Sequence, residues 1–169
     1  MSKAVLISIR PRWCEKIVNG NKTIEVRKTR PKMNTPFKCY IYCTLPKYPH
    51  EVFIATNYPM PQFYGGGKVI GEFTCERIAL IAYDGGELSS TTNAAFSPAT
   101  CLTQSEIIAY IGDKGRCYGW HMSNLRIYDT PRELSEFTGL RNTRFGAEPY
   151  DIKRPPQSWG YVQEVTCDE

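Results

Sequence analysis

Short runs in which apolar and polar residues alternate dominate the chain, and stretches rich in glycine and proline separate them. Alternation with a period of two is typical of β-strands, because successive side chains point to opposite faces. Gly71, inside one of these runs, marks a bulge or a close approach of two backbones. The predicted strands are Ala4–Ile9, Thr23–Lys28, Phe37–Thr44, Lys68–Ile81, Cys117–Tyr128 and Ser158–Val165.

Two stretches carry helix signals instead. Pro11 occupies a first-turn position, where its missing N–H costs nothing, and Gly20 ends the helix that it begins. In Leu102–Ile111, Thr103 and Glu106 form a capping box ahead of an isoleucine stripe. A brief helical turn is also predicted around Pro131–Phe137.

These elements predict an α+β fold, a small and mainly antiparallel sheet or β-barrel with two principal flanking helices and long loops. The 169 residues suit a single domain spanning 1–169. Residues 45–67 combine four prolines with five aromatic residues and predict a loop insertion. Residues 84–100 are predicted to be a mobile loop, and residues 138–156 a second basic segment outside the core.

The net charge of +4 is distributed unevenly. Residues 1–47 contain eleven Lys and Arg against two acidic residues and carry +9, whereas the rest of the chain carries −5. Such asymmetry is typical of a protein that binds a polyanion. It does not separate RNA from DNA, from a nucleotide or from a merely soluble surface.

The cysteines and apolar runs bear on metal, cofactor and location. Seven cysteines without a C-x-x-C pair, and two histidines far apart in sequence, argue against a common zinc site. We therefore expect no metal and no cofactor. Cysteines in apolar runs indicate reduced core thiols in a cytoplasmic protein. No run suits a signal peptide or a membrane span, so no membrane partner is expected, and the oligomeric state is left open.

The densest group of charged candidates follows the Gly20 turn. If Thr23–Lys28 is a strand, Glu25 and Arg27 share one face, and Lys22 lies where the strand begins. An ammonium, a carboxylate and a guanidinium this close can act as an acid and base set or as an anion clamp, because each charge alters the protonation of its neighbours. The same pattern also suits a solvated strand face with an ordinary ion pair.

Aromatic residues are the second kind of candidate. Trp13, Trp120 and Trp159 each suit a hydrophobic core, and beside Lys and Arg they also suit a pocket in which a base stacks on a ring. His121, next to Trp120, is interpreted as a structural, hydrogen-bonded histidine rather than a catalytic one.

Several motifs together resemble the ASCH domain, a branch of the PUA-like superfamily. Its G-x-K-x-x-E-x-R pattern is matched by Gly20, Lys22, Glu25 and Arg27. Further segments resemble a group of ASCH proteins common in bacterial and phage genomes, and they cover most of the chain in order: Ser8–Pro11, Tyr40–Tyr42, Val69–Phe73, Tyr118–His121 and Pro155–Trp159.

The resemblance implies a five- or six-stranded barrel with helices at its openings and a cleft into which the motif residues project. It also implies RNA binding, and the wider superfamily includes readers of modified bases. Some small ASCH proteins are amidohydrolases that act on N4-acylated cytidine with a lysine, a threonine and a glutamate. Lys22 matches that lysine, but Glu25 stands where the threonine would fall.

The preferred hypothesis is a nucleic-acid-binding module, most suited to RNA, with a basic cleft built on this motif. Glu25 orients the cations or accepts a hydrogen bond from an exocyclic amine, and a tryptophan stacks a base. The predicted contact residues are Arg10, Lys22, Arg27, Lys28, Trp120 and Trp159.

Two further hypotheses stay open. The protein could be a hydrolase of RNA or of a modified, N4-acylated cytidine nucleoside, with Lys22 as base or nucleophile, Glu25 or Glu72 as proton shuttle and Arg27 as the group that stabilises developing negative charge. It could instead be a phage factor that docks on a host protein through residues 45–67, because aromatic residues are enriched at interface cores.

Overall fold

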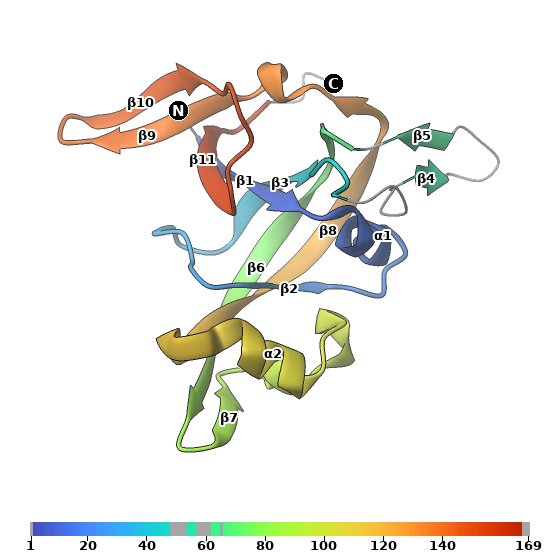
Figure 1. The fold of residues 1–169 in the computed structure, drawn as a ribbon. Coiled ribbons are helices and arrows are strands. Elements are labelled where there is room, and N and C mark those ends of the chain that lie inside the picture. The colour runs from blue at the N-terminus through green and yellow to red at the C-terminus, as the bar shows by residue number, and fades with distance from the viewer. Residues whose placement is uncertain (1, 48–53, 57–61, 65, 167–169) are drawn as a thin grey trace. The chain divides into compact units, whose positions relative to one another are not determined.

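A computed structural model describes residues 2–47, 54–56, 62–64 and 66–166 (Figure 1). The contacts between residues divide the chain into two compact units. Unit 1 comprises Met1–Glu15, Lys38–Phe73 and Leu125–Glu169, and unit 2 comprises Lys16–Phe37 and Thr74–Asn124. The single-domain assignment stays a prediction.

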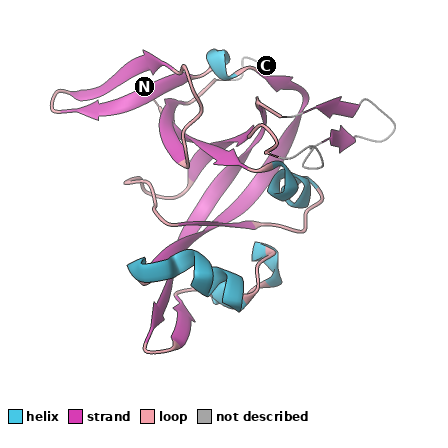
Figure 2. Ribbon diagram, viewed as in Figure 1, coloured by secondary structure: helices cyan, strands magenta, loops and turns pink. Residues whose placement is uncertain are grey.

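Strands make up most of the regular structure, as Figure 2 shows by colour. The strands are β1 (Lys3–Ile9), β2 (Ile24–Arg27), β3 (Phe37–Cys43), β4 (Ile54–Thr56), β5 (Gln62–Tyr64), β6 (Lys68–Asp84), β7 (Glu87–Ser90), β8 (Arg116–Arg132), β9 (Thr138–Thr143), β10 (Gly146–Asp151) and β11 (Trp159–Gln163). The α-helices are α1 (Pro11–Val18) and α2 (Gln104–Ile111), and the 3₁₀ turns are η1 (Asn93–Phe96), η2 (Pro98–Thr100), η3 (Gly112–Lys114) and η4 (Leu134–Glu136).

The fold is α+β with a mostly antiparallel sheet, as predicted, but the sheet is large rather than small and the predicted barrel is not closed. Among the described residues the strand pairings follow an open path, β10-β9-β11-β1-β3-β6-β8-β2, with β7 added to β6. Its first strand, β10, pairs with β9 as a hairpin and has mostly exposed residues. Within the described residues, β10 and β2 are therefore the two edge strands of this path.

Unit 1 is built around β1. All residues from Ala4 to Ile9 are buried, and β1 is an interior strand of the sheet, with β11 antiparallel along one edge and β3 parallel along the other. The continuous apolar run is thus a fully covered strand, as the sequence predicts. Its core cluster comprises Ala4, Leu6, Tyr40, Tyr42, Val69, Tyr128, Phe137 and Val162.

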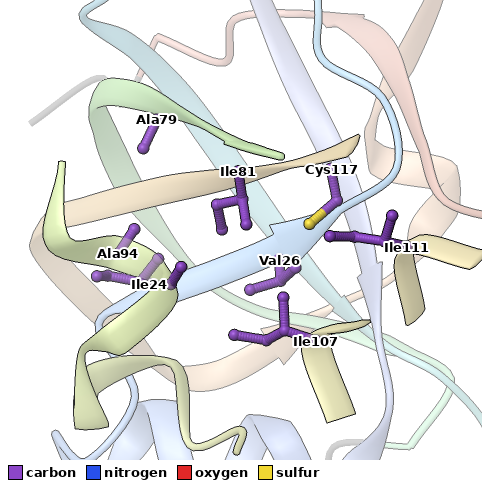
Figure 3. Packing of buried hydrophobic residues seen from close by; sticks show 9 residues of the cluster. Ile24, Val26, Ala79, Ile81, Ala94, Ile107, Ile111 and Cys117 are labelled. Carbon is purple, nitrogen blue, oxygen red and sulfur yellow. The ribbon is translucent and has the colours of Figure 1, made fainter. Parts of the chain in front are cut away.

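Unit 2 packs α2 and η1 against β2, β6 and β8. The predicted capping box is present, with Thr103 Oγ1 accepting from Glu106 N and Glu106 Oε2 accepting from Thr103 N. Figure 3 shows the apolar side chains that these elements bring together. They include Ile24, Val26, Ala79, Ile81, Ala94, Ile107, Ile111 and Cys117.

Two predicted irregular segments have regular structure. Residues 84–100, predicted as a mobile loop, contain β7, η1 and η2, and they bury Ala94, Ala95 and Thr100. Much of the predicted basic segment 138–156 is the β9 and β10 hairpin (Figure 1). Most of the predicted insertion at 45–67 lies outside the described residues, and within it β4 pairs with β5.

The described cysteines are all free thiols, and five of the six are buried. Burial raises the pKa of Cys75 to about 12 and that of Cys117 to about 11. These values keep both thiols protonated at neutral pH and hence unreactive. The expectation of reduced core thiols agrees with this arrangement.

The predicted close approach at Gly71 is confirmed and yields a stability prediction. A Cβ at position 71 would lie 2.4 Å from the Arg126 carbonyl oxygen, so Gly71→Ala must push β6 away from β8. We expect the free energy of unfolding to fall by about 1 to 3 kcal/mol, measured by urea titration.

Gly160 provides the matched control in the same unit. A Cβ there would meet Pro156 at an ordinary 3.6 Å, so Gly160→Ala should have a much smaller effect. Equal stability of the two variants would contradict the close approach of the strands.

Candidate functional site

The three charged residues of the G-x-K-x-x-E-x-R motif meet in unit 2. Lys22 follows the Gly20 turn, whose φ of +75° suits glycine, and precedes β2. Its Nζ donates to the carbonyl oxygens of Ile24 at 3.0 Å and Thr100 at 2.7 Å, and it lies 3.3 Å from Glu25 Oε2. The Lys22 ammonium is therefore occupied by protein acceptors.

Glu25 continues this chain of charges to Arg27. Arg27 Nε donates to Glu25 Oε1 at 2.9 Å, as expected for two residues on the same face of a strand. Lys22 and Glu25 are 3% and 5% exposed, and the side chain of Arg27 is 12% exposed. The alternating charges leave one net positive charge, and Arg27 is the member closest to solvent.

Aromatic residues flank these charges. Trp120 lies opposite Glu25 in the register of β8 and β2, is fully buried and packs edge-on against Phe37 at 6.0 Å. The exposed Lys28 places its ammonium over the Tyr110 ring at 5.2 Å. Burial raises the pKa of Tyr110, and Arg27 opposes that shift.

The remaining predicted residues, Arg10, Glu72 and Trp159, belong to unit 1. Arg10 is exposed between β1 and α1. Trp159, in β11, lies opposite Ile7 of β1. Its ring packs edge-on against that of Tyr161, with 5.4 Å between the ring centroids. The structure therefore joins Lys22, Glu25 and Arg27 directly and groups Glu72 with a different set of side chains.

Glu72 belongs to a partly buried polar cluster that sequence reasoning missed. Tyr128 Oη donates to Glu72 Oε2 at 2.6 Å, and Lys38 Nζ lies 3.4 Å from Glu72 Oε1 and 3.7 Å from Glu164 Oε1. Burial, and then the hydrogen bond to Glu72, raise the pKa of Tyr128. In the sequence, each of these polar residues stands inside a predicted apolar strand. Such a position does not reveal which side chain is its hydrogen-bond or ion-pair partner.

A pocket of about 400 Å³ in unit 2 was also missed. It is bounded by β6, by the start of β2, by His121 of β8 and by residues 92–99. His121 Nε2 and Thr92 Oγ1 are 3.1 Å apart, which agrees with the interpretation of His121 as a hydrogen-bonded residue. No sequence signal pointed to this pocket, because one wall is the segment predicted as a mobile loop.

No cluster of three or more His, Cys, Asp or Glu side chains in the described part of the chain is placed to hold a metal ion. Among the same residues, no helix is both long and apolar enough to cross a membrane.

Comparison with known proteins shows the fold. No family model matches the chain, and no curated protein matches its sequence. Among solved structures, the ASCH protein of Zymomonas mobilis gives a TM-score of 0.60 at 18% identity, covering 95% of this chain and 88% of that one. A serine-to-alanine mutant of that protein gives the same TM-score and identity, covering 95% and 89%. A tyrosine-to-phenylalanine mutant gives 0.54 at 17%, covering 96% and 92%. The chain therefore has an ASCH-type fold, as the sequence resemblance predicts.

Proposed function

We propose that this protein binds nucleic acid, and RNA in particular, through exposed cations that follow β2. One observation carries the proposal: from Val26 to Phe37, unit 2 contains four cations and no acidic residue. Lys28, Arg30 and Lys32 are exposed, and Arg27 is the first of the four cations in sequence. Clustered exposed cations are what a phosphate backbone requires of a protein surface.

Within this proposal the predicted residues take different roles. Lys28 contacts phosphate directly, and Arg27 does so from a position fixed by Glu25. Lys22 neutralises Glu25 and supports that position from the interior. Trp120, being buried beside Phe37, supports β8 from within the fold.

Arg10 and Trp159 of unit 1 stay predicted contacts. Arg10 is exposed, and Trp159 is half-buried with part of its surface open. RNA binding is also what the resemblance to ASCH domains implies. We further propose a cytoplasmic location, which the free thiols of the described cysteines favour.

The hydrolase alternative receives no comparable support from the described residues. It requires Lys22 to act as a base or nucleophile, but the Lys22 ammonium faces two carbonyl oxygens and the Glu25 carboxylate. Likewise, Glu72 is held by Tyr128 and Lys38. These contacts are what a structural role demands.

Salt dependence tests the binding proposal. We expect a labelled single-stranded RNA of about twelve nucleotides to bind with an affinity that falls steeply with salt, because each phosphate contact releases counterions. The double variant Lys28→Ala/Arg30→Ala should weaken binding and make the slope of log K against log salt shallower by about 1.4, at about 0.7 for each phosphate that is no longer neutralised. Fluorescence anisotropy between about 50 and 300 mM salt measures both quantities.

Lys114→Ala/Arg116→Ala is the control, because it removes two exposed cations of the same unit outside this run. An equal loss of affinity in both double variants would show that only general charge matters. Absence of salt-sensitive binding to RNA and DNA would overturn the proposed function.

The interior role of Lys22 is tested by stability. Lys22→Met would leave Glu25 Oε2 and two carbonyl oxygens without their cationic partner. Breaking a buried ion pair in this way costs about 3 to 5 kcal/mol, so we expect a loss of that size in denaturant unfolding.

The exposed Lys16 in α1 provides the control, and Lys16→Met should change stability by no more than about 0.5 kcal/mol. If Lys22→Met is as stable as wild type but binds RNA more weakly, Lys22 is a contact residue and not an interior support.

A further inference from the structure

The pocket beside His121 has the size of a ligand site. Its volume of about 400 Å³ falls within the range of small-molecule pockets, about 300 to 1,000 Å³. Strand β6 contributes Glu76 and Arg77, and residues Thr92 and Asn93 line the wall formed by the segment before η1 and by η1 itself. None of the three charged motif residues lines this pocket.

The pocket contains equal numbers of positive and negative groups at neutral pH. Burial, and then the nearby Arg77 guanidinium, lower the pKa of His121, and Glu76 opposes this shift. His121 is therefore a neutral imidazole at pH 7, which leaves one guanidinium and one carboxylate. A site for bare phosphate would be cationic, whereas this pocket suits an uncharged ligand that both donates and accepts hydrogen bonds.

Nucleobases are ligands of this kind. A carboxylate accepts from an exocyclic amino group, and an arginine donates to carbonyl or ring-nitrogen acceptors at a base edge. The hydroxyl of Thr92, the amide of Asn93 and the His121 ring add further polar atoms. Ile24, Ala94 and Met122 add apolar wall that can pack against a flat ring.

We propose that this pocket receives one unstacked nucleobase with an exocyclic amino group from the RNA bound by the protein. This inference rests on the proposed function and extends it from phosphate contact to base recognition. Adenine, cytosine and guanine carry the amino group that Glu76 accepts from. Uracil lacks that group, so it should gain least from the pocket.

A base-substitution series tests the proposal. The probes are a labelled RNA of about twelve uridines and the same RNA with one central cytidine, adenosine or guanosine. A matched base contact is worth about 1 to 3 kcal/mol, so wild type should bind at least one substituted RNA about fivefold or more tightly than the all-uridine RNA. Glu76→Ala leaves no side-chain acceptor for the amino group, so it should remove this preference and leave the affinity for the all-uridine RNA within about twofold.

Glu87→Ala in β7 is the matched control, because it removes an exposed acid of the same unit outside the pocket. It should preserve the preference. Thermal melting of each variant verifies that it is folded. A second variant, His121→Gln, retains a polar partner for Thr92 and should reduce the preference.

The outcomes separate the two proposals. Salt-sensitive binding of every RNA with no base preference would overturn the pocket assignment and leave the proposed function standing. If no RNA binds, the proposed function fails, and titration with adenosine, cytidine, guanosine and uridine then tests whether the pocket binds a base. Shifts of the Thr92, Asn93 and His121 amide signals with at least one of the three nucleosides that carry the amino group, and not with uridine, would support the assignment. Their absence with all three would overturn it.

Discussion

The buried Lys22 ammonium is the interaction on which the surroundings of β2 depend. Met122 N donates to the Thr23 carbonyl, so antiparallel alternation turns the next carbonyl, that of Ile24, away from β8 and toward the open edge of the sheet. Lys22 binds that carbonyl and also the Thr100 carbonyl, which attaches η2 to this edge. A buried cation requires a counter-charge, and Glu25 provides it. The second carboxylate oxygen of Glu25 then accepts a hydrogen bond from Arg27. The buried Lys22 ammonium therefore fixes the positions of both Glu25 and Arg27.

The segment from Asp84 to Thr100 completes this arrangement. Gly85 and Gly86 have φ values of +57° and +87°, and these allow the tight turn between β6 and β7. The chain then returns over the sheet and buries Ala94 and Ala95 in the core of unit 2. Small side chains let its backbone lie close to the strands, where the Ala99 carbonyl accepts from Thr23 N. The same small residues leave room for the pocket beside His121.

Local sequence patterns predicted much of the fold, but they could not reveal contacts between residues far apart in the sequence. The strand periods, the Thr103 capping box and the Gly71 approach are all encoded within a few residues of sequence. The β9 and β10 hairpin was missed because both strands are mostly polar in sequence and β10 is mostly exposed, so they lack the apolar alternation by which strands are recognised. Alternation also predicted that Glu25 and Arg27 would meet. It could not reveal the acceptor of Lys22 at Thr100, which lies 78 residues further along the chain.

The two faces of β2 separate the two kinds of contact proposed for this protein. Ile24 and Val26 point into the apolar cluster, and Ile24 lies beside His121 at the pocket wall. Glu25 and Arg27 point to the opposite face, where the cationic run begins. The side chains of both faces are attached to the same four-residue backbone, so a shift of that backbone moves the side chains on both faces. Side-chain substitutions on one face, however, leave the chemistry of the other face intact. The proposed phosphate contact and the proposed base contact therefore rest on different side chains, and substitutions can test each one separately.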